Sequence, residues 1–296
     1  MKTYLTFDGG PIYVDLNIGE SVEAPGGREA KLIDIGYQGP VGKPGRAEFG
    51  WAKVVIDDLA VDIPLGWWRT VGGVRVAAEL NGVYNTDPVR KRWELDYWRL
   101  EHDARLMLSD GLRPITPAGR YAFPVVSDGW SWGYGHNWLS KYTFMFGLNP
   151  THYGIDIDCP VGVATVRASI GGRIVYIGGY KEHDEIGSPG IVVTVLGDDG
   201  LGYLYCHMSA LESGMEEGAR IETRQPIGTN GISGAENVNC TPHTHFEVIW
   251  GESPEALLHP LRPPWCDESH KTLAFVVNPL PYLYQWFEEW LAVEDV

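Results

Sequence analysis

Short runs of β-branched and aromatic residues, separated by turn residues along the whole chain, are the feature that most constrains this sequence. The 296 residues include 37 glycines and 20 prolines, which interrupt runs rich in valine, isoleucine, tyrosine and tryptophan. This pattern is typical of β-strands joined by turns. We therefore predict a mostly β protein.

The length and one connecting segment predict two domains. At ~150 residues per domain, the chain fits two domains better than one. Residues 11–80 alternate and indicate a small β-domain, 87–110 fit either a helix or a strand, and 111–120 are rich in proline and glycine. We expect an N-terminal β-domain of unknown role over 1–115. Stronger strand signals follow and predict a compact antiparallel β-sheet domain with a C-terminal extension over 116–296.

Charge and hydropathy exclude several classes of partner. The net charge of −16 repels nucleic acid and anionic lipid surfaces. The apolar runs are far shorter than the ~18–20 residues that span a bilayer, so we expect no transmembrane helix. The N-terminus lacks the apolar region of a signal peptide. The chain is therefore either cytoplasmic, or periplasmic or extracellular after removal of a leader. Its four cysteines form no CxxC pair and are either free thiols or include one disulfide.

Two segments place polar groups on one strand face. In THYGIDID, alternation along a strand puts His152, Gly154 and Asp156 on the same side, with the glycine leaving space for an ion. In PHTHFEV, the same alternation puts His243 and His245 on one face. Each segment therefore offers side chains that can ligate a metal.

The neighbouring positions extend these polar faces. In GYLYCHM, alternation predicts that His207 shares a face with Tyr203 and Tyr205. Glu247 shares the face of His243 and His245, the histidines of the HxH motif in PHTHFEV. There it is either an acceptor for a ligand imidazole or an exposed carboxylate at a strand end. We favour the exposed carboxylate.

Four imidazoles and one carboxylate suit zinc. A catalytic zinc ion has three protein ligands and a fourth position open to water, so this set is larger than the ion needs. The set is best divided into three ligands and two catalytic imidazoles outside the coordination sphere.

Residues from about 121 to 262 resemble the lysostaphin- and LytM-type zinc metallopeptidases, which are glycyl-glycine and peptidoglycan endopeptidases. HYGIDI, GYLYCHMSAL and PHTHFEV follow that family's pattern in order. The resemblance implies Zn²⁺ as the cofactor and peptide bonds of peptidoglycan cross-links or stems as the substrate. The implied zinc ligands are His152, Asp156 and His245, and the implied catalytic pair is His207 and His243.

The segment before the first implied ligand departs from the family pattern. It reads WSWGYGHNW where the family has a glycine-rich turn and an arginine, so Tyr134, His136 and Asn137 are candidates for a different substrate subsite.

Two alternatives stay open beside the endopeptidase. One is a zinc-dependent lyase or hydrolase of another polymer, such as an acidic polysaccharide, and the other is a non-catalytic binding or regulatory module. Family habit favours the cell envelope or the exterior, and the oligomeric state does not follow from the sequence.

Overall fold

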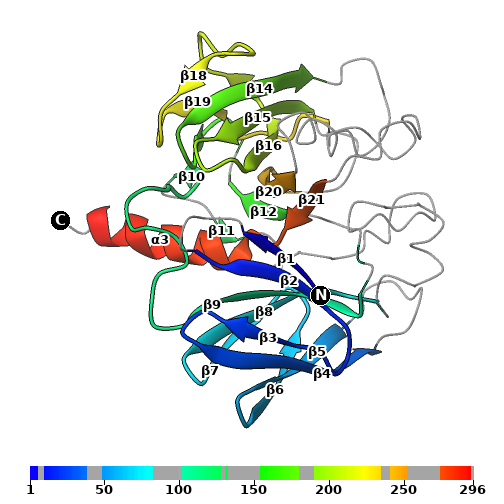
Figure 1. The fold of residues 1–296 in the computed structure, drawn as a ribbon. Helices are drawn as coiled ribbons and strands as arrows, with labels where there is room; N and C mark the ends of the chain where they lie inside the picture. Colours follow the sequence, from blue (N-terminus) through cyan, green and yellow to red (C-terminus); the bar gives the residue numbers. More distant parts are fainter. Residues whose placement is uncertain are drawn as a thin grey trace. The chain divides into compact units, whose positions relative to one another are not determined.

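The computed structural model describes most of the chain and divides it into two compact units (Figure 1). The described residues are 1–5, 10–38, 49–82, 100, 102–127, 131–132, 154–159, 161–179, 190–234, 241–251 and 274–294. Among them, the first unit ends at Thr116 and the second begins at Pro117. Strands dominate both units, so the predicted mostly β class is confirmed.

Two antiparallel sheets build the first unit. The five-stranded sheet has the order β1 (Lys2–Leu5), β2 (Ile12–Leu16), β9 (Ala104–Asp110), β8 (Val74–Asn81) and β7 (Trp68–Val71). The four-stranded sheet follows chain order as β3 (Ser21–Ala24), β4 (Arg28–Gln38), β5 (Phe49–Ile56) and β6 (Leu59–Pro64). Strand β9 shows that the end of the ambiguous stretch 87–110 is a strand, while residues 87–99 lie outside the described part.

The core of the first unit is apolar and contains one buried ion pair. Valine, leucine, isoleucine and alanine side chains from both sheets form a single buried cluster. Arg105 on β9 donates two hydrogen bonds to Asp15 on β2, from Nε at 2.7 Å and from Nη2 at 2.9 Å. Both side chains are 2% exposed, so each charge depends on the other for its stability inside the unit.

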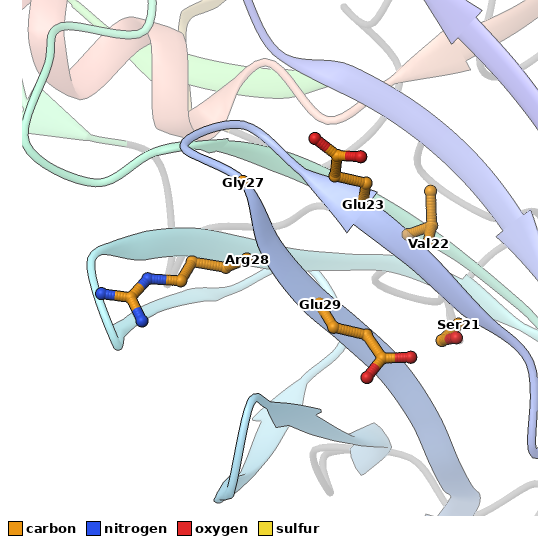
Figure 2. A pocket seen from close by; sticks show the side chains of 6 residues that line it. All are labelled: Ser21, Val22, Glu23, Gly27, Arg28 and Glu29. Atoms are coloured by element: carbon orange, nitrogen blue, oxygen red, sulfur yellow. The ribbon is translucent and has the colours of Figure 1, made fainter.

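A hollow in the first unit lies along the hairpin of β3 and β4. It measures about 420 Å³ and is lined by Ser21, Val22, Glu23, Gly27, Arg28 and Glu29. Figure 2 shows Glu23 and Glu29 pointing away from each other and Arg28 turning away from both. Arg28 instead donates a hydrogen bond of 2.7 Å to Asp57. The charged groups of this hollow do not converge on one point, so it is a poor candidate for a ligand site.

The second unit contains one large sheet and one small sheet. The large sheet has the order β11 (Ser131–Trp132), β12 (Ile155–Asp158), β20 (His243–Gly251), β16 (Gly202–Met208), β15 (Ile191–Gly197), β14 (Gly172–Gly179) and β18 (Arg220–Ile221), and β21 (Ala274–Val277) also pairs with β20. The small sheet has the order β10 (Val125–Val126), β13 (Thr165–Arg167), β19 (Pro226–Thr229) and β17 (Ala210–Leu211). All of the strand pairs are antiparallel, as predicted.

The C-terminal extension forms helix α3 (Leu280–Glu294). Asn278 caps its start, because its Oδ1 accepts a hydrogen bond of 3.0 Å from the Leu280 N–H, and Pro279 occupies the position where a missing N–H costs nothing. Trp286 on α3 stacks on Tyr121 at 5.2 Å between ring centroids and contacts Phe246 of β20 at 6.3 Å. The helix therefore packs on the large sheet. Within the described part of the chain, no helix is long and apolar enough to cross a membrane.

Candidate functional site

The pairing of β12 with β20 brings the first predicted site residues together. In this register Asp156 lies opposite His245 and Asp158 lies opposite His243. Residues opposite each other in an antiparallel pair share a face of the sheet. His245 Nδ1 is 3.0 Å from Asp156 Oδ1, and His243 Nε2 is 3.6 Å from the same oxygen. One carboxylate thus lies beside both histidines of the HxH segment.

Glu247 completes a buried row of polar groups on β20. His245 Nε2 lies 2.8 Å from Glu247 Oε1, and Glu247 is 7% exposed. The expectation of an exposed carboxylate at a strand end is therefore wrong, since β20 continues beyond Glu247 to Gly251. Burial disfavours a charge on His245, but its hydrogen bonds to Asp156 and Glu247 outweigh that penalty and raise its pKa to about 10.

Gly154 gives room to the His245 imidazole. A Cβ at this position would lie 2.5 Å from the carbonyl oxygen of Phe246 and 2.7 Å from His245 Nε2. That this glycine also leaves space for an ion stays a prediction. The absence of a side chain lets the imidazole ring pack against the backbone that precedes β12.

His207 reaches the histidines of β20 through a bulge in β16. The pairing of β15 with β16 shifts register between Tyr205 and Met208, which leaves an extra residue on β16, and His207 has a φ of 66°. A bulge of this kind redirects side chains. The ring of His207 lies 4.7 Å from that of His243, measured between centroids. It also lies 6.1 Å from the ring of His245.

The bulge turns the His207 side chain to the face of the sheet opposite to the predicted one. Tyr203 and Tyr205 pack against Phe246, with ring centroids 6.4 and 5.4 Å apart, on the face of the large sheet opposite to His245. Strict alternation places His207 with these tyrosines and is wrong here, because the left-handed backbone at His207 turns its side chain to the other face.

Backbone carbonyl groups fix the protonation pattern of His207 and His243. The Nδ1–H of His207 donates to the Ser233 carbonyl oxygen at 2.8 Å, and the Nδ1–H of His243 donates to the Thr241 carbonyl oxygen at 2.7 Å. A carbonyl oxygen can only accept, so each neutral ring carries its proton on Nδ1 and has a lone pair on Nε2. Burial, followed by the neighbouring charges of His243 and His245, lowers the pKa of His207 to about 3.

Sequence reasoning missed two further residues on this face. Asp158 lies opposite His243 in register and accepts a hydrogen bond of 3.1 Å from the Thr241 hydroxyl, and burial raises its pKa. The alternation of IDID, which places Asp156 and Asp158 on one face, was the available signal. Cys206 lies opposite His245 and is buried, and burial raises its pKa well above the usual value. Cys159 and Cys206 are free thiols, while Cys240 and Cys266 lie outside the described residues.

The remaining predicted site residues lie outside the described part of the chain. They are His152, Tyr134, His136 and Asn137. Among the residues that the structure does describe, no group of three or more His, Cys, Asp or Glu side chains is arranged to hold a metal ion. Asp156 Oδ1 and His245 Nδ1 nevertheless face each other, and carboxylate oxygen and imidazole nitrogen are donors that zinc accepts. This donor pair fits zinc, with a third ligand still to be supplied.

The comparisons with known proteins point to one family. The sequence model of peptidase family M23 matches residues 150–256, which include β12, β16 and β20. None of the curated proteins matches the chain.

Several solved structures are similar to this chain. A LytM protein of Ruminococcus gnavus is 19% identical with a TM-score of 0.41, over 60% of this chain and 64% of its own. Lysostaphin of Staphylococcus simulans is 21% identical with a TM-score of 0.32, over 46% of this chain and 45% of its own. The isolated catalytic domain of lysostaphin is 21% identical with a TM-score of 0.36, over 52% of this chain and 92% of its own. The chain therefore spans less than two thirds of the length of the first two.

Proposed function

Residues 150–256 form a domain of peptidase family M23, and from this premise we propose that the protein is a zinc-dependent endopeptidase acting on peptidoglycan. The bonds cleaved would be peptide bonds of cross-links or stems. The observation that carries the proposal is the convergence of Asp156, His245, His243 and His207 on one face of the large sheet. Each belongs to one of the predicted segments THYGIDID, GYLYCHM and PHTHFEV.

The proposed metal ligands are His152, Asp156 and His245. Zinc supplies a Lewis acid for the scissile carbonyl and a bound water of lowered pKa when it is present. Glu247 accepts a hydrogen bond from His245 Nε2, which leaves Nδ1 as the atom of His245 that faces Asp156. A fixed second hydrogen bond of this kind orients a ligand imidazole and raises its basicity.

His207 and His243 are the proposed acid–base pair. Because both neutral rings present an Nε2 lone pair, either one can accept a proton from the attacking water. A neutral ring held in this way has no Nε2–H to donate. The ring that stabilises the developing oxyanion must therefore receive a proton first. We take this ring to be His243, because the Asp156 carboxylate, 3.6 Å from His243 Nε2, favours a positive charge there, and we take His207 as the base. The two roles can also be exchanged.

Charge bears on the alternative substrates. Three carboxylates, those of Asp156, Asp158 and Glu247, share the site face, and the chain carries a net charge of −16. An acidic polysaccharide would be repelled from such a site. This disfavours the alternative of a lyase or hydrolase of an acidic polymer and favours recognition of the peptide part of the wall. Such a substrate would require the protein to act in the cell envelope or outside the cell.

An activity screen tests the proposed function. The zinc-loaded protein is incubated with purified peptidoglycan, glycine-rich peptides and uronate polymers, and products are identified by mass spectrometry. We expect new peptide amino termini, absent after treatment with a chelator. Unsaturated uronate products would instead support the lyase. Absence of turnover in a protein that binds one zinc would support the non-catalytic module.

A further inference from the structure

Ser233 binds the bulge of β16 at His207 and at Met208, the residue that follows it. Its carbonyl oxygen accepts the His207 Nδ1–H at 2.8 Å, and its hydroxyl donates to the carbonyl oxygen of Met208 at 2.7 Å. The same hydroxyl oxygen accepts a hydrogen bond of 2.9 Å from the Ile191 N–H at the start of β15. One serine therefore binds the His207 side chain, the residue after it and the neighbouring strand.

The position of Ser233 is fixed by close packing. Gly190, whose φ is 61°, lies so near that a Cβ there would collide with the carbonyl group and the hydroxyl of Ser233. Gly231, two residues before Ser233, packs in the same way against the backbone of the bulge. A Cβ there would lie 2.4 Å from Ser209 N and 2.7 Å from His207 O. Two glycines thus allow the turn at Ser233 to approach the bulge closely.

The backbone of His207 needs this support. A residue other than glycine in the left-handed region is strained and persists only where its surroundings impose the conformation. Hydrogen bonds to such a residue and to its neighbour can offset this strain. Ser233 bonds to the side chain of the strained residue and to the backbone of Met208, the residue that follows it, so both bonds are placed to hold the bulge in this conformation.

We propose that Ser233 is a positioning residue that sets the tautomer of His207. Its hydroxyl anchors the turn so that its carbonyl meets Nδ1, which leaves the Nε2 lone pair of His207 directed to the side of His243 and His245. Without the anchor, the ring could also take the Nε2–H tautomer, which cannot accept a proton at that atom. The inference deepens the proposed function and rests on it for the catalytic consequence alone.

Nitrogen-15 NMR tests the proposal without any substrate. Two-bond ¹H–¹⁵N correlation spectra of the zinc-loaded full chain, labelled in histidine, distinguish the two tautomers of a neutral ring, and the His207→Ala spectrum identifies the signals of His207. We expect the Nδ1–H tautomer in the unaltered protein. Ser233→Ala should give a mixture of tautomers, and Ser233→Thr, which keeps a hydroxyl, should restore the original pattern.

Ser209→Ala is the matched control. Ser209 follows the same strand, and its hydroxyl contacts the Thr229 hydroxyl at 3.0 Å and the Asn230 carbonyl at 2.9 Å, with no bond to His207. Its spectrum should match that of the unaltered protein.

On a cleaved substrate, Ser233→Ala should lower kcat by about 10- to 100-fold, with KM changed by less than about twofold, since a small misplacement of a catalytic group affects mainly the chemical step.

Two results would overturn the proposal. One is the Nε2–H tautomer of His207 in the unaltered protein, which needs no variant to fold. The other is a Ser233→Ala protein that keeps the tautomer pattern of the control. Absence of turnover in the unaltered protein would contradict the proposed function and would leave the spectroscopic result to decide the role of Ser233.

Discussion

Replacing Gly154 by alanine should damage the site selectively. The new Cβ would lie 2.5 Å from the Phe246 carbonyl oxygen, whereas ordinary van der Waals contact begins at 3.4 Å. The obstructing atom belongs to the backbone of β20, which pairs with β12 at this point, so no flexible side chain can move away. Relief requires either separating the strands or displacing the His245 ring, whose Nε2 is 2.7 Å from the same Cβ.

The expected cost follows from these contacts. Overpacking of this kind costs ~1–3 kcal/mol. Displacing the His245 ring also removes one of its two hydrogen bonds to carboxylates, at 3.0 and 2.8 Å, and such a bond is worth ~1.5–3 kcal/mol. We therefore expect Gly154→Ala to lose ~2.5–6 kcal/mol of unfolding free energy. It should also bind zinc about 10- to 100-fold more weakly, because the orientation of a ligand is disturbed.

The assay combines two measurements on the same preparation. Denaturant unfolding of the metal-free protein gives the free-energy change, and titration against a competing chelator gives the zinc affinity. Gly171→Ala is the control in the same unit, because the nearest atom to its Cβ would be the end of the flexible Asp198 side chain at 3.2 Å. A Gly154→Ala protein as stable as this control, with unchanged zinc affinity, would refute the reasoning.

Three further predictions concern the side chains of the site. Alanine at Asp156 or His245 should abolish stoichiometric zinc in metal analysis, whereas alanine at His207 or His243 should keep the metal and lower kcat by ~10²–10⁴; zinc retained by His245→Ala would contradict the ligand assignment. Glu247→Ala should weaken zinc binding by ~10- to 100-fold in a chelator competition, and Glu247→Gln, which keeps an acceptor, should weaken it less. In the metal-free protein, the pKa of His245 is raised from 6.5 to about 10. Protonated His245 therefore stabilises the fold fully below pH 6.5. This contribution, at most ~5 kcal/mol, is lost as the pH rises to 10. The difference in unfolding free energy between the unaltered protein and His245→Ala should therefore shrink over that range, and a constant difference would contradict the electrostatic account.

Regular strands made part of the site predictable from the sequence. IDID and HTHFEV alternate without interruption along β12 and β20, so their face assignments needed only the period of two along a strand. The structure adds the register, which sets Asp156 opposite His245. Register between strands far apart in the sequence depends on the whole sheet and cannot be predicted from either segment alone.

Other parts of the site depend on features without a clear local signal. The bulge at His207 arises where β15 and β16 pair with unequal numbers of residues, which neither sequence reveals alone. Glu247 lies inside β20 rather than at its end, because the strand continues to Gly251 and pairs with β16 and β21, which lie far from it along the chain. Helix α3 could have been predicted, since Asn278 and Pro279 are a cap and a first helical residue.

Contacts on the face of β20 opposite to His243 and His245 hold this strand in place. Between the two histidines, Thr244 points to the opposite face, is fully buried and donates a hydrogen bond of 2.7 Å to Asn230 Oδ1. Asn230 in turn donates to the Cys159 carbonyl oxygen at 2.7 Å, just after β12. Phe246, the next residue on that face, contacts Trp286 of α3. Because a strand is stiff and its side chains alternate, fixing Thr244 and Phe246 on one face also fixes His243 and His245 on the other. The C-terminal helix is therefore part of the support of the site.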